Sequence, residues 1–340
     1  MTNAEARGEL LEALRLSRGL TQTEVAAVTG ISQASLSKAE SGADLDEEKW
    51  DALADLLGVP VSAFAGVTSS AAPARIFHRK LKSTPKAAVT KVAAELSLVR
   101  LRVRDLMGQQ RTTLTLHDLD DGFITPQEVA QDVREELGLG AGPIKNLVAV
   151  LEDAGVLVLR WPLETIQVDA IASWQDGEVP VILVGEHVPA DRQRFTVAHE
   201  LGHAVMHDSE ANAPQEKEAD AFAAEFLVPA ASLATEWPSP ATLETLLPLK
   251  KRWGVSLAAL IRRGRDTDLL TEDEYRTWSI QLSTSGMHRR EPDPTERENP
   301  TALETAIRKS IDAGASVDEL ASSAFMFPRE FRHTFLQESS

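Results

Sequence analysis

The sequence predicts an α+β protein that is mostly helical, with one small antiparallel sheet between helical regions. Over most of the chain, apolar residues recur at spacings of three and four, which is typical of amphipathic helices. Residues 156–185 differ, because they hold three short β-rich runs, and an Asp-Gly pair at 176–177 predicts a hairpin turn. With 340 residues, the chain is long enough for two or three domains.

The composition excludes several kinds of site. The chain has no cysteine, so disulfides, thiol nucleophiles and cysteine zinc clusters are excluded, and any metal ligands must be His, Asp or Glu. The net charge of −17 argues against a general positive coating for nucleic acid, although a locally shaped DNA-binding surface is compatible with it. No apolar run is long enough to cross a membrane, and the polar N-terminus has no signal-peptide core. We therefore expect a cytoplasmic protein with no membrane partner.

Residues 1–66 are predicted to form five short helices, with breaks at glycines (Gly19, Gly30, Gly42 and Gly58). Thr21, followed three residues later by Glu24, has the pattern of a capping box. Ser32 is placed to cap a further helix at 33–40. Two short helices joined by a turn that contains glycine predict a helix-turn-helix.

Three segments of this region resemble the lambda Cro-like XRE helix-turn-helix domain: RGLTQ at 18–22, SLSKAESG at 35–42 and LADLLGVP at 53–60. The resemblance covers residues 1–66 and implies a lambda-repressor-like fold and a DNA operator as partner. Gln33 can pair with adenine, Ala34 can touch a thymine methyl group, and Gln22 can contact a phosphate. The DNA-binding residues implied by the match are Gln22, Ser32, Gln33, Ala34, Ser35, Ser37 and Lys38. Because one such module recognises only a half-site, a homodimer is expected.

The charge of this region departs from that of a strongly basic DNA-binding domain. Residues 1–66 hold five basic residues against eleven acidic ones, so few phosphate contacts are available. The alternative is a module used for protein contact or dimerisation. Residues 75–111 hold ten basic residues against two acidic ones and have the spacing of one long amphipathic helix. This helix either supplies phosphate contacts or docks on the acidic remainder of the molecule, and we favour docking.

A metal-binding pattern lies at His199-Glu200-x-x-His203. Two histidines four residues apart on a helix lie one turn above each other, so both imidazoles can reach one metal ion. Glu200 projects to the side where a water bound by that metal would lie, and can act as the catalytic base. A third ligand is expected from the helix predicted at 216–229, where Glu216 and Asp220 share a face. We expect Glu216 to be the ligand and Asp220 to orient an imidazole, with Glu218 as the alternative ligand.

His207 lies one further turn along the same face of the metal helix. Such an imidazole can bind substrate or stabilise the oxyanion. A polar group at the helix end is the simpler interpretation, and we prefer it. The run at 179–185 precedes the metal helix, so we expect it to flank that helix and to bind an extended peptide by strand addition.

The segments TVAHELGHAVMH at 196–207 and EKEADAFAAEFLVP at 216–229 resemble the ImmA/IrrE family of zinc metallo-endopeptidases. The pattern RQRFTVAHELGH at 192–203 also matches, and the similarity extends upstream through 126–185. The resemblance implies a gluzincin-like domain in which Zn²⁺ is held by His199, His203 and Glu216, with Glu200 as base. It also implies a protein substrate, since known members cleave helix-turn-helix repressors.

The motifs divide the chain into four parts: a DNA-binding domain at 1–66, a linker at 67–74, a peptidase domain at 75–235 and a helical C-terminal region at 236–340. The leading hypothesis is a transcriptional regulator that cleaves an XRE-type repressor, or itself, in response to stress or a signal. The alternative is a DNA-binding repressor or antitoxin whose zinc-peptidase fold acts as a sensor or scaffold without proteolysis. A third possibility is an interaction module that binds a toxin partner.

Overall fold

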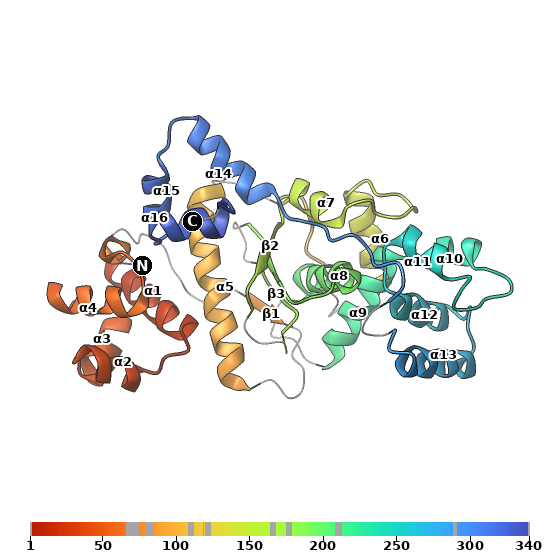
Figure 1. Cartoon of the computed structure of the whole chain (residues 1–340), viewed down its shortest axis with the longest axis horizontal. Helices are drawn as coiled ribbons and strands as arrows, with labels where there is room; N and C mark the ends of the chain where they lie inside the picture. Colours follow the sequence, from red (N-terminus) through yellow and green to blue (C-terminus); the bar gives the residue numbers. More distant parts are fainter. Residues whose placement is uncertain are drawn as a thin grey trace.

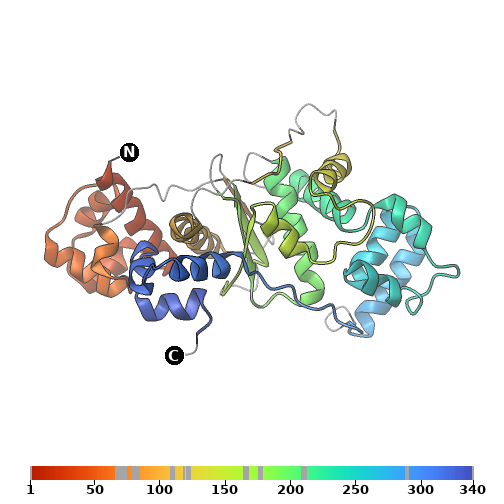
Figure 2. The ribbon, with the colours of Figure 1, turned by 90° about the horizontal axis from the view of Figure 1, so that it is seen from above.

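The computed structural model describes residues 2–65, 75–78, 85–107, 112–117, 119, 124–163, 168–174, 179–207, 213–287 and 291–338. Figures 1 and 2 show an elongated molecule with the first four helices at one end, the sheet in the middle and α10–α13 at the other end. The predicted linker at 67–74 lies outside the described residues. No helix in the described ranges is long and apolar enough to cross a membrane.

The N-terminal region contains four α-helices and one 3-10 helix. The α-helices are α1 (Asn3–Ser17), α2 (Gln22–Thr29), α3 (Gln33–Glu40) and α4 (Glu47–Leu57), and the 3-10 helix η1 (Val61–Phe64) stands where a fifth helix was expected. Thr21 and Glu24 form the predicted capping box on α2, and Gly30 ends that helix in the left-handed conformation. The Ser32 side chain caps α3 by accepting a hydrogen bond from the Ser35 backbone.

The central sheet has four strands in the order β1-β3-β4-β2: β1 (Arg75–His78), β2 (Leu157–Trp161), β3 (Ala170–Trp174) and β4 (Val181–Gly185). β3 pairs antiparallel with both β1 and β4, but β2 and β4 run parallel. The prediction of a wholly antiparallel sheet is therefore wrong for this pair. The parallel pair arises because β4 lies between β3 and β2, so that β3 pairs with one edge of β4 and β2 pairs with the other.

This order also contradicts the prediction that residues 179–185 bind a peptide by strand addition. Both edges of β4 are already paired, so its backbone has no open side for another strand. The prediction of a single helix over 75–111 is wrong at its start, where Arg75–His78 forms β1 and the helix α5 runs only from Lys86 to Met107. Ile76 and Phe77 favour a strand, and Pro85 directly precedes the first residue of the helix.

Helices cover both faces of the sheet. Side chains alternate along each strand: Ile182 and Val184 of β4 join the core beneath α8 (Ala190–Met206), whereas Val181 and Leu183 join the core beneath α5. The first core also receives α6 (Pro126–Glu136), α7 (Leu147–Asp153) and α9 (Ala213–Leu227). The second receives α14 (Ala302–Asp312), α15 (Val317–Ser323) and α16 (Pro328–Phe335).

The basic helix α5 docks between the N-terminal helices and the sheet. Leu98 and Leu101 belong to the N-terminal core, whereas Leu96 and Val99 pack toward the sheet. Arg102 is 7% exposed and donates to the Ala324 carbonyl, and burial lowers its pKa to about 10. The buried guanidinium of Arg102 is therefore not available to DNA, and this part of α5 packs through apolar side chains, whereas the favoured interpretation expected docking on acidic groups.

The residues after α9 complete both ends of the molecule. Four helices form the far end: α10 (Ala230–Glu236), α11 (Leu247–Trp253), α12 (Leu257–Asp266) and α13 (Glu272–Thr284). The following segment then crosses back, so that α14–α16 lie beside α5 in both views. Phe325 on this return path is 7% exposed within the N-terminal core. The N-terminal helices are therefore packed on the rest of the chain through α5 and Phe325.

Candidate metal centre and DNA-binding helix

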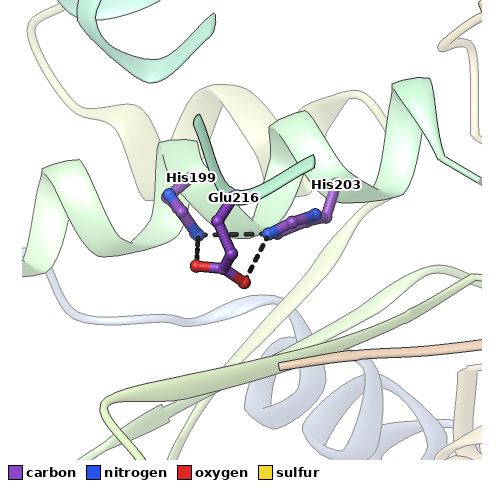
Figure 3. Close-up of side chains that lie close together, drawn as sticks. All are labelled: His199, His203 and Glu216. Carbon is purple, nitrogen blue, oxygen red and sulfur yellow. Dashed lines mark hydrogen bonds and ion pairs between the residues drawn. The ribbon is translucent and has the colours of Figure 1, made fainter. Parts of the chain in front are cut away.

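The predicted metal motif lies in the middle of α8, which packs along α9. Gly202 permits this close packing, since a Cβ atom built on it would lie 2.9 Å from the Phe222 ring. Both histidines of the motif are buried: His199 is 1% exposed and His203 is 0% exposed. Their imidazoles and the Glu216 carboxylate, from α9, point toward one another (Figure 3).

The three side chains bring their donor atoms to the separations that a metal site requires. The Nε2 atoms of His199 and His203 are 3.1 Å apart, and the Glu216 oxygens lie 3.6 Å from the first and 3.4 Å from the second. A tetrahedral zinc ion with bonds of about 2.05 Å holds its ligand atoms about 3.3 Å apart. His199, His203 and Glu216 therefore form a donor set of the right chemistry and spacing for one zinc ion.

Two of the three side chains are in the deprotonated state that metal binding requires, and the third is not. Burial lowers the pKa of His203 to about 4, so its imidazole is neutral at neutral pH. Burial acts to raise the pKa of Glu216, but its hydrogen bonds to the two histidines outweigh this effect and lower the value to about 2. Burial likewise opposes a charge on His199, but contacts with Asp220 and Glu216 raise its pKa to about 9. Binding of a metal ion through Nε2 of His199 would therefore require the loss of one proton from this ring.

Asp220, which the sequence predicts to orient an imidazole, lies in contact with His199. Its Oδ1 atom lies 3.0 Å from Nδ1 of His199, and its Oδ2 atom lies 3.3 Å from a guanidinium nitrogen of Arg262. Arg262 was not identified from the sequence, because nothing in the pattern of α12 distinguishes it from other exposed basic residues. Asp220 and Arg262 also form part of the wall of a cavity of about 530 Å³ between α8, α9, α12 and α13.

His207 and Glu218 form a contact of their own beside the metal site. His207 is the C-cap of α8, and its side chain is 3% exposed. Its Nδ1 atom lies 2.9 Å from Nδ1 of His203, and its Nε2 atom lies 3.0 Å from Oε2 of Glu218. Both ring nitrogens of His207 are therefore engaged, which argues against the oxyanion role considered from the sequence. Glu218 lies against His207 and is not among the three clustered metal-donor side chains.

Glu200 lies on α8 directly after the first histidine of the motif. It is 0% exposed, and its charge contributes to the raised pKa of His199. A carboxylate next to an imidazole that could hold a metal ion is a suitable proton acceptor for general-base chemistry.

The predicted DNA-binding residues lie on α3 and at the start of α2. Leu36 and Ala39 are buried, which leaves the opposite face of α3 in solvent, including Gln33, Ala34, Ser37 and Lys38. Ser32 and Ser35 bond to each other at 2.8 Å as part of the helix cap. The Gln22 amide donates to Glu40, which also pairs with the buried Arg15. The side chain of Gln22 is thus held toward α3.

Comparison with known families agrees with both motifs. Residues 11–64 match the family model of the helix-turn-helix, and residues 151–264 match that of the IrrE N-terminal-like domain, a peptidase family. A comparison with curated proteins gives no match. The chain thus combines a DNA-binding type of domain with a metallopeptidase-like domain. More particularly, it is the predicted fusion of an XRE-type helix-turn-helix with an IrrE/ImmA-like domain.

Proposed function

We propose that this protein is a cytoplasmic transcriptional regulator that binds an operator through α3 and cleaves a protein substrate at a zinc site. The observation that carries the peptidase part is the cluster of His199, His203 and Glu216, with the buried Glu200 on the same helix. A purely structural metal site has no need for an additional buried carboxylate next to a ligand.

The residues of the chain have separate roles in this proposal. His199, His203 and Glu216 would hold the ion, and Asp220 would keep His199 in the required tautomer. Bound zinc would supply Lewis-acid chemistry to a water molecule and to the scissile carbonyl. Glu200 would accept a proton from the attacking water and transfer it to the leaving amine as the carbon–nitrogen bond breaks. The second proton of the water also goes to the leaving nitrogen, so the products are a carboxylate and an ammonium group, and the atoms and protons balance.

The proposed substrate is a protein, either an XRE-type repressor or the helix-turn-helix segment of this chain. Two measurements test the proposal directly: the zinc content of the purified full-length protein and mass spectrometry of its incubation with such a repressor. We expect one zinc per chain and defined cleavage products. Zinc binding without cleavage of either protein would favour the alternative of a repressor or antitoxin whose peptidase fold acts as a sensor or scaffold, or of a module that binds a toxin partner.

The DNA-binding part of the proposal leads to a test at Gln33, whose side chain is exposed on α3. We expect Gln33→Ala to weaken binding to the specific operator by about 1–3 kcal/mol, since one bidentate base contact is lost. The affinity for random DNA should change little, because non-specific binding depends on phosphate contacts. Ser41→Ala, at the other end of the helix, is the control. Equal losses on operator and random DNA would contradict a base-reading role for Gln33.

We further propose that the protein acts as a homodimer, because a single helix-turn-helix module recognises only a half-site. Sedimentation of the full-length protein with its own promoter should give a complex with two chains per operator. A one-to-one complex at high protein concentration would contradict this arrangement.

A further inference from the structure

The two metal-binding histidines differ in how their second ring nitrogen is bonded. Nδ1 of His199 meets the Asp220 carboxylate directly at 3.0 Å. Nδ1 of His203 instead meets another imidazole, His207, at 2.9 Å, and the far nitrogen of His207 meets Glu218 at 3.0 Å. This series of contacts therefore runs from His203 through the ring of His207 to the Glu218 carboxylate.

Only one arrangement of protons makes this series of contacts compatible with metal binding. Nε2 of His203 must keep its lone pair for the metal, so the proton of a neutral His203 is on Nδ1. Nδ1 of His207 then has to accept that hydrogen bond, which places the proton of a neutral His207 on Nε2. From there it is donated to the Glu218 carboxylate. Each hydrogen bond in the series thus has one donor and one acceptor.

We propose that His207 and Glu218 are positioning residues that hold His203 in its metal-binding tautomer and orientation. This inference rests on the metal centre of the proposed function but does not depend on peptidase activity. His207 is well suited to the role, because it is buried at the end of the same helix as His203. Glu218 is 36% exposed, so the hydrogen-bonded series runs from the buried ligand to the solvent-facing side of α9.

Helix α9 thus supplies one metal ligand and both orienting carboxylates. Glu216, Glu218 and Asp220 occupy alternate positions on α9, and each is directed at the histidine-bearing helix α8. A shift of α9 relative to α8 would therefore disturb the ligand and the partners of both imidazoles together. This arrangement gives His207 a function that a polar group closing the helix end would not have.

The test is the zinc affinity of the full-length protein, measured by competition with a chelator. His207→Leu keeps a side chain of similar size but removes both hydrogen-bonding nitrogens, and we expect it to bind zinc about 10–100-fold more weakly. His207→Gln keeps an acceptor and a donor, so it should restore a large part of the affinity. Glu218→Ala should weaken zinc binding in the same direction. The visible absorption of the Co²⁺-loaded protein should change with His207→Leu, because the orientation of His203 alters the ligand field.

Met206→Ala is the matched control, since Met206 is a buried neighbour of His207 that belongs to the apolar core. It should lower the melting temperature but leave zinc affinity and the Co²⁺ spectrum unchanged. The proposal is overturned if His207→Leu binds zinc as tightly as the parent, or if Met206→Ala weakens zinc binding equally. A parent protein that binds zinc but cleaves nothing would count against the peptidase proposal alone, and the role of His207 would still be tested.

Discussion

Glu200→Gln should abolish protein cleavage while leaving zinc bound. The substitution keeps the size of this fully buried side chain but removes its ability to accept a proton. Loss of a general base typically costs about 10²–10⁴ in rate. We expect a decrease of at least this size in the appearance of cleavage products by mass spectrometry, with one zinc per chain retained. The metal content separates loss of the base from loss of the site.

Glu225→Gln is a useful control for this experiment. Glu225 is a second buried glutamate, on α9, and pairs with Arg263 away from the three metal-binding side chains. Its replacement should lower stability without removing a proton acceptor from the site. If both variants lose cleavage to the same extent, instability and not base catalysis explains the result.

The Glu200→Gln variant also distinguishes the two leading functions in cells. A regulator that acts by proteolysis should lose control of its target genes, although the variant still binds its operator. A repressor that uses the peptidase fold only as a sensor or scaffold should be unaffected. Normal regulation by Glu200→Gln, at equal protein level, would exclude peptidase action as the mechanism.

Local sequence signals were sufficient to predict the helices that carry both sites. The spacing of His199 and His203 and the cap at Ser32 depend on neighbouring residues alone, and the structure contains both features. The four-residue spacing of Glu216 and Asp220 on α9 places them on a shared face, and both contact His199.

Tertiary contacts account for what the sequence did not predict. The parallel pairing of β2 with β4 depends on which edge of β4 receives β3, and no local pattern determines this choice. The contact of Arg262 with Asp220 joins residues from distant helices. The position of Glu218 against His207 likewise depends on where the end of α8 lies relative to α9, which is a property of the packing.

Glu216→Ala should eliminate stable zinc binding, whereas Glu218→Ala should only weaken it. The two acids lie two residues apart on α9, but only Glu216 places its oxygens within 3.6 Å of both ligand nitrogens. Without Glu216, two histidines remain, which is one ligand fewer than the three that a catalytic zinc site uses. Chelator competition on the full-length proteins gives the comparison. Because Glu218→Ala keeps all three ligands, it should retain one zinc per chain at saturating metal.

The ratio of the two effects identifies the third ligand. If Glu218→Ala loses the metal and Glu216→Ala retains it, the assignment of Glu216 is wrong and Glu218 is the third ligand. Glu216→Gln adds a finer test, because its amide oxygen keeps the geometry but lacks the negative charge. An intermediate zinc affinity for Glu216→Gln would indicate that the ion requires the charge of Glu216 as well as its position, as expected for a carboxylate bound directly to a dication.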